Sequence, residues 1–187
     1  MKNLLKVVAV GISLVLLSGC ASPFISPADV DRSAYKVDPS EKVSSNHKLS
    51  NNVTVETTGF LETTKVYIKR NSKSNLNDEN AKKAIEKSLK AAGMFGGLSG
   101  DYTLKATLVD SDIGNIFSTR SYKRKMIINY KLINDISGEV LYDKTITGHG
   151  KGEFYIITFD HYGREQDVAE KAFKDNFRQL IEDLKSL

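Results

Sequence analysis

Two stretches of the sequence repeat apolar residues at intervals of three and four, the spacing of a helix with one wet side and one buried side. The first covers residues 77–93, where Asn77 is suited to cap the helix and Gly93 to end it. The second covers residues 166–184, close to the end of the chain. The apolar positions are Ala81, Ala84, Ile85, Leu89 and Ala92 in the first stretch, and Val168, Ala169, Ala172, Phe173, Phe177, Leu180, Ile181 and Leu184 in the second. The pattern predicts two amphipathic helices.

Between these helices, apolar and polar residues alternate, which is the pattern of half-buried strands. It predicts strands over residues 102–108, 122–133 and 140–147, and Ser137-Gly138 marks a hairpin between the last two. Shorter β-prone runs lie at 53–60 and 64–69, and a further strand at 153–160 is left open. We predict an α+β domain: an antiparallel sheet of three to five strands, in strand-helix-strands-helix order, with the two helices packed on one face.

Residues 20–52 show neither of these two periods. From residue 21 to residue 52 there are seven serines and all three prolines of the chain. A flexible chain of this length has a root-mean-square span of ~30 Å. The composition predicts a flexible tether over residues 20–52, followed by a single domain over residues 53–187 whose apolar content is enough for one core.

The first nineteen residues have the three parts of a secretory signal peptide. Lys2 and Lys6 precede an apolar run at residues 7–17, and small residues follow it. The run has about eleven residues, whereas a membrane-spanning helix needs roughly twenty. We therefore predict that residues 1–19 are cleaved. Their loss lowers the formal net charge from +4 to +2, so the basic pI does not argue for a nucleic-acid partner.

Leu17-Ser18-Gly19-Cys20, which contains the single cysteine, resembles the lipobox of bacterial lipoproteins at all four positions. The resemblance implies cleavage before Cys20, a diacylglyceryl group on its thiol, and acylation of the new N-terminus, with palmitate as the expected fatty acid. Two or more acyl chains hold a protein on a bilayer, whereas one binds only marginally. In enteric lipoproteins an aspartate directly after the cysteine retains the protein in the inner membrane, so the resemblance, with alanine at position 21, implies the periplasmic face of the outer membrane. An unmodified thiol after the signal peptide is the alternative.

The domain also resembles YajG-type outer-membrane lipoproteins and the auxiliary lipoproteins of ABC-type transport systems. The likeness is one of layout, and it rests on five features: Ala91-Ala92-Gly93, the strand at 101–106, Tyr130-Lys131-Leu132 leading to Gly138, the glycines after Thr147, and the C-terminal helix. It implies an envelope protein without catalytic activity.

Few residues offer catalytic chemistry. The three histidines, His47, His149 and His161, have no tight metal-ligand spacing, and no Gly-x-Ser-x-Gly sequence occurs. We predict no catalytic residues, no metal site and no cofactor. The glycines of Gly148-His149-Gly150-Lys151-Gly152 could cradle a phosphate, but such loops open a helix and a β-prone segment follows here. A bulge or a close approach of another backbone is the favoured interpretation.

Two groups of residues could contact a partner. Met94, Phe95 and Leu98 lie among glycines directly after the first helix, where they could either pack on the core or contact a protein or lipid. Arg120, Lys123, Arg124 and Lys125 could bind an envelope polyanion or could be the charged edge of a strand.

These observations favour a non-catalytic, lipid-anchored module that binds another envelope component, a protein or a lipid, in transport or assembly. The alternative is a binding protein for lipid or another small amphiphile, with an apolar cleft lined by Phe154, Ile156 and Phe173. A filled core beside an exposed 94–98 loop would favour the first hypothesis.

Overall fold

The computed structural model of the protein describes residues 27–60, 75–113, 121–153 and 161–187. The predicted signal peptide, Cys20, the start of the tether, the strand at 64–69, Arg120 and residues 154–160 lie outside these ranges. In the described ranges, no helix is long and apolar enough to cross a membrane.

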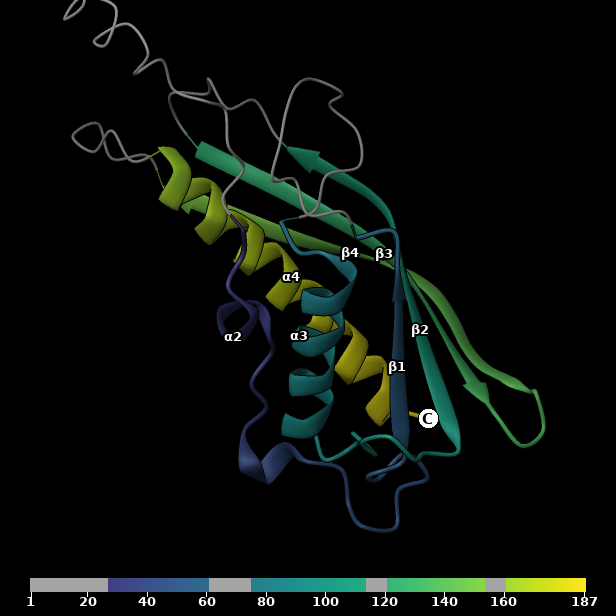
Figure 1. Ribbon diagram of the computed structural model, residues 1–187. Helices are drawn as coiled ribbons and strands as arrows, with labels where there is room; N and C mark the ends of the chain where they lie inside the picture. The colour runs from purple at the N-terminus through teal and green to yellow at the C-terminus, as the bar shows by residue number, and fades with distance from the viewer. Residues whose placement is uncertain (1–26, 61–74, 114–120, 154–160) are drawn as a thin grey trace, which may run out of the picture.

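Four strands form one sheet in the order β1-β2-β3-β4 (Figure 1). They are β1 (Val53–Thr58), β2 (Tyr102–Ile113), β3 (Ser121–Asn134) and β4 (Val140–Glu153). The predicted antiparallel meander of β2, β3 and β4 is confirmed. The sheet as a whole is mixed, however, because β1 pairs with β2 in the parallel sense. Helix α3 (Asp78–Ala91) lies between β1 and β2 in the sequence and returns the chain to the other end of the sheet, as parallel neighbours require.

Helices α3 and α4 (His161–Lys185) pack on the same face of the sheet, so the predicted α+β class with two helices on one face is confirmed (Figure 1). Asn77 caps α3 as predicted, since its side chain accepts a hydrogen bond from the Asn80 N–H at 2.7 Å. The core lies between the two layers. Its largest buried side chains include those of Phe60, Leu76, Ile85, Leu89, Leu104, Met126, Ile128, Tyr130, Phe173 and Phe177.

Helix α4 lies unusually close to β4, and two glycines allow it. A Cβ atom added at Gly150 would be 1.9 Å from the Val168 carbonyl oxygen, and one added at Gly148 would be 2.1 Å from the Ala172 carbonyl oxygen. These distances are far shorter than van der Waals contact. The sequence favours a bulge or a close approach of another backbone over a phosphate loop. The structure confirms the close approach at Gly148 and Gly150.

Asn176 of α4 joins the helix to the sheet at this contact. Its buried side chain accepts a hydrogen bond from the Tyr130 hydroxyl at 2.7 Å and donates to the Met126 and Ile146 carbonyl oxygens at 3.0 and 2.9 Å. Asn176 thus satisfies polar groups of β3 and β4 inside the core.

We expect Asn176→Leu to lower the free energy of unfolding by about 2 kcal/mol, because it leaves the buried Tyr130 hydroxyl without its acceptor. Adding Tyr130→Phe should restore part of this loss, since the orphaned hydroxyl is then removed as well. Urea denaturation followed by circular dichroism measures both variants. A double variant no more stable than Asn176→Leu would contradict this account.

Residues 27–52 do not form the flexible tether that the composition predicts. They contain helix α2 (Val30–Ser33) and the 3-10 helix η1 (Pro39–Glu41), and Leu49 is fully buried. Backbone hydrogen bonds tie this segment to the end of α3: the Val43 N–H donates to the Ala92 carbonyl oxygen and the Asn51 N–H to that of Gly93. The segment has no period because single apolar side chains, rather than a repeating face, anchor it.

Candidate functional site

The loop after α3 separates the three apolar residues predicted to act together. The helix ends in a Schellman motif, in which the Gly93 N–H donates to the Lys90 carbonyl oxygen and the Met94 N–H to that of Leu89. Gly93 has a φ of 78°, which favours glycine at this position. The motif turns Met94 back into the core, where it is fully buried, while Phe95 is half-buried and Leu98 is fully exposed. Met94 therefore follows the core-packing alternative, and Leu98 is free to contact a partner.

Past its first turn, the loop lies along the start of β1. The Val53 N–H donates to the Met94 carbonyl oxygen at 3.0 Å, and the Gly96 N–H donates to the Val53 carbonyl oxygen at 2.9 Å. A Cβ atom added at Gly96 would be 2.8 Å from the Asn51 carbonyl oxygen, so this contact needs glycine. The loop thus covers the outer edge of β1 at Val53.

Two residues further on, no described strand or loop pairs with the outer edge of β1. Because backbone groups alternate between the two sides of a strand, the N–H and C=O of Val55 point the same way as those of Val53, away from β2. In the described part of the chain, no strand pairs with β1 on that side. Val55 therefore directs one donor and one acceptor to that side, beside the exposed Leu98, although the residue as a whole is only 3% exposed.

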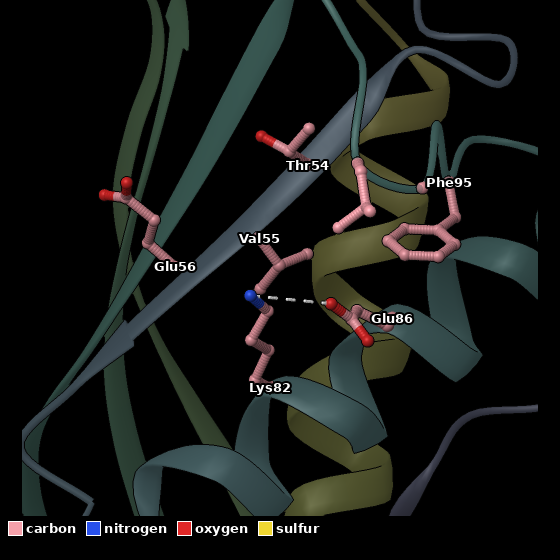
Figure 2. Close-up of a pocket in the computed structure, with 8 residues that line it drawn as sticks. Thr54, Val55, Glu56, Lys82, Glu86 and Phe95 are labelled. Carbon is pink, nitrogen blue, oxygen red and sulfur yellow. Dashed lines mark ion pairs between the residues drawn. The ribbon is translucent and has the colours of Figure 1, made fainter.

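These features lie in an open groove of about 430 Å³ between β1, α3 and the loop (Figure 2). It is lined by Thr54, Val55, Glu56, Lys82, Glu86, Phe95, Gly97 and Leu98. Lys82 and Glu86 of α3 form an ion pair at 3.9 Å on one wall, and Phe95 lies on another. The described lining residues include no histidine, cysteine or serine, and they combine apolar surface, a charged pair and strand-edge backbone. This combination suits binding better than catalysis.

The predicted basic cluster does not form one surface, because neighbouring residues of β3 point to opposite faces of the sheet. Arg124 is only 2% exposed and forms an ion pair with Glu165 of α4 at 3.1 Å. Burial lowers the pKa of Arg124 to about 10, and the Glu165 carboxylate opposes that fall. Arg124 is therefore wrongly predicted as a surface contact. It belongs to the contact between sheet and helix.

Lys123 and Lys125 are exposed on the face of the sheet that the helices leave uncovered. Across the β3–β4 pairing, Lys123 is opposite Lys151 and Lys125 is opposite His149, and both of these residues are exposed as well. We call Lys123, Lys125, His149 and Lys151 the basic patch. His149 and Lys151 were not predicted as part of it. The alternation of Gly148, Gly150 and Gly152 with them is the signal that could have found them, because glycines facing a helix place the intervening residues on the opposite face.

No metal-binding group of three His, Cys, Asp or Glu side chains occurs in the four described ranges. His47 instead accepts a hydrogen bond from the Leu49 N–H at 3.2 Å through Nδ1.

No protein-family model matches this sequence, and no curated protein matches it. Solved structures do match. A "putative lipoprotein" from Caulobacter crescentus CB15 has 11% identity and a TM-score of 0.50, over 74% of this chain and 90% of that one. A protein from Xanthomonas campestris assigned to DUF330 has 12% identity and a TM-score of 0.53, over 79% and 88%.

A minor lipoprotein from Acinetobacter baumannii also aligns, with 12% identity and a TM-score of 0.48 over 73% of this chain and 92% of that one. At these identities the likeness is one of fold. The resemblance to YajG-type lipoproteins stays a prediction. The chain shares its fold with these bacterial proteins from Caulobacter and Xanthomonas. The name given to the Caulobacter protein agrees with the lipobox resemblance of this sequence.

Proposed function

We propose that this protein is a lipid-anchored lipoprotein on the periplasmic face of the bacterial outer membrane, and that it acts without catalysis as an adaptor in transport or assembly. Its partner is another envelope protein, which contributes an extended segment to the groove beside β1. The observation that carries this proposal is the outer backbone edge at Val55, with which no described strand pairs, in the groove next to the exposed Leu98.

An extended peptide fits this edge for two reasons. The outward N–H and C=O of Val55 can pair with the backbone of an added strand, which is a common mode of peptide recognition. Leu98 and the half-buried Phe95 offer apolar surface at one end of the groove. Burying one leucine side chain contributes about 1.5–3 kcal/mol.

The charged residues of the groove are placed to select one partner peptide over others. Lys82 and Glu86 lie where the side chains of an added strand would pass, and Glu56 lies at the rim. Charges at the rim of an interface fix orientation and select partners more than they add affinity.

The rival function, binding of a small amphiphile in an apolar cleft, needs space around Phe173. Phe173 is fully buried, and its ring centroid lies 6.5 Å from that of Phe60 and 5.8 Å from that of Phe177. Phe154 and Ile156, the other residues predicted to line such a cleft, lie outside the described ranges. The filled core around Phe173 favours the adaptor.

The test is photo-crosslinking in living cells with a benzophenone amino acid at Leu98. We expect one discrete protein adduct from this position and none from Ile136. Ile136 is the matched control because it is also an exposed large apolar residue, in the β3–β4 hairpin, and is not among the residues that line the groove.

A second measurement tests the strand addition itself. With the crosslinked partner purified and bound, the backbone amide of Val55 should exchange hydrogen at least about tenfold more slowly, because its N–H becomes paired. Adducts of equal yield at Leu98 and Ile136 would contradict the proposed groove. Unchanged exchange at Val55 would contradict strand addition.

A further inference from the structure

The basic patch has a charge arrangement that folding does not explain. Lys123 and Lys151 are directly opposite each other in the β3–β4 register, and like charges at such positions destabilise a sheet. None of the three lysines of the patch forms an ion pair with a described residue. Asp112 of β2 is paired with Lys125 of β3 and is the acidic residue next to the patch in the strand register. The patch therefore has an excess of positive charge on an uncovered sheet face.

The described chain begins at the same end of the molecule as this patch, with α2 packed on α3 and α4 and the patch on the other side of the sheet. The Asp29 N–H donates to Glu170 of α4 at 2.9 Å, and Arg32 forms an ion pair with Asp167 at 3.1 Å. The same turn of α4 contains Val168, whose carbonyl oxygen lies directly against Gly150 of β4. Gly150 stands between His149 and Lys151 of the basic patch, so the patch is at the same end of α4 as Asp29 and Arg32. Figure 1 shows α2 beside α4, with the β3–β4 hairpin at the opposite end of the sheet.

The reach of the anchor sets how far this end can be from the membrane. Cys20 precedes Pro27 by seven residues, which span at most about 25 Å when fully extended. Because residues 28–49 pack on the domain, the greatest distance between the acylated cysteine and the folded domain is much shorter than a thirty-residue tether would allow. The end of the sheet with the basic patch is thus held near the bilayer.

The far end of the sheet has the opposite character. Asp101 precedes β2, and Asp135 and Glu139 lie in the β3–β4 hairpin, and all three are exposed. An anionic surface repels these carboxylates and attracts the lysines at the near end. The charge distribution therefore favours one orientation of the domain.

We infer that the basic patch lies against the anionic phospholipid headgroups of the membrane that holds the lipid anchor, so that this end of the sheet faces the bilayer and the hairpin points away. The inference rests on the lipid anchoring proposed above. Lysine suits the contact because its long apolar stem lets the ammonium reach headgroup phosphates. Each lysine near an anionic membrane strengthens binding about fivefold, so three contribute on the order of 100-fold.

The test is lysine acylation, read by mass spectrometry, of the native lipidated protein in vesicles that contain about 30% phosphatidylglycerol, which gives the bilayer a negative surface potential. We expect Lys123, Lys125 and Lys151 to react at least threefold more slowly than in pure phosphatidylcholine vesicles. Lys48, Lys90 and Lys174 are internal controls, since they are exposed and lie outside the patch. Their rates should not change.

A binding measurement uses the whole mature chain with Cys20→Ser, so that no acyl chain contributes. We expect K123Q/K125Q/K151Q to bind the anionic vesicles at least tenfold more weakly than K48Q/K90Q/K174Q, which has the same net charge. Salt at about 0.5 M should remove the difference, because exposed charges are then screened over about 4 Å.

If anionic vesicles slowed the patch lysines no more than the three control lysines, or if the two triple variants bound vesicles equally, the inference would be overturned and the anchor proposal left intact. Protection by isolated peptidoglycan but not by anionic vesicles would overturn it too. Failure of the native protein to float with any vesicle would instead count against the anchor, and with it against both proposals.

Discussion

Replacement of Gly150 by alanine is expected to remove most of the stability of the domain. The added Cβ would lie 1.9 Å from the Val168 carbonyl oxygen and 2.9 Å from the Ala172 nitrogen, and both atoms belong to the backbone of α4. A side chain could rotate away from such a clash, but a helix backbone must shift as a whole. We expect a loss of about 4 kcal/mol or more, against a typical total of about 5–15 kcal/mol.

Gly138→Ala is the matched control for this prediction. Gly138 has a φ of 72° and nothing within 4 Å of an added Cβ, so the variant meets backbone strain without a clash. Its expected cost is about 1 kcal/mol. Urea denaturation of both variants measures the difference, and limited proteolysis does so if Gly150→Ala does not fold. Equal stability of the two variants would show that α4 does not lie against β4 at Gly150.

Replacement of Cys20 by alanine is expected to release the mature protein from the membrane. At ~0.8 kcal/mol per buried methylene, two or more acyl chains keep a protein on the bilayer, and no acyl chain remains without the thiol. We expect incorporation of a labelled palmitate analogue to fall to background. The fraction of mature protein in carbonate-washed membranes should fall at least tenfold.

Ser22→Ala is the matched control, because it changes a small residue just beyond the cleavage site. It should be labelled and membrane-bound like the wild type. Mass spectrometry of the wild-type N-terminal peptide should find residue 20 first, carrying acyl groups. Palmitate labelling of Cys20→Ala, or its full retention in membranes at the mature size, would contradict the lipoprotein hypothesis.

The parallel pairing of β1 with β2 could have been predicted from element order. A strand, a helix and a second strand in succession bring neighbouring strands into the parallel sense, whereas short loops give antiparallel ones. The three-strand meander was predicted because its connections are short. For β1, the β-prone run at residues 53–60 indicated a strand but not which strand it pairs with.

The candidate site was predicted in part. Leu98 was expected as one of three contact residues, and the structure leaves it exposed while the Schellman motif buries Met94. The open edge at Val55 could not be predicted, since it depends on where the 94–96 loop stops covering β1. The basic patch likewise depends on the β3–β4 register, which joins residues about 25 positions apart in the chain.

The sequence by itself determined the features that depend on neighbouring residues: the lipobox, both amphipathic helices, the Asn77 and Gly93 caps of the first helix, and the alternating strands. Only the tertiary structure decided that residues 27–52 pack on the domain, that Arg124 is buried against Glu165, and that Lys151 joins Lys123. The physical reason is that periodicity and capping act over a few residues, whereas register, burial of single side chains and open edges arise from contacts between distant parts of the chain.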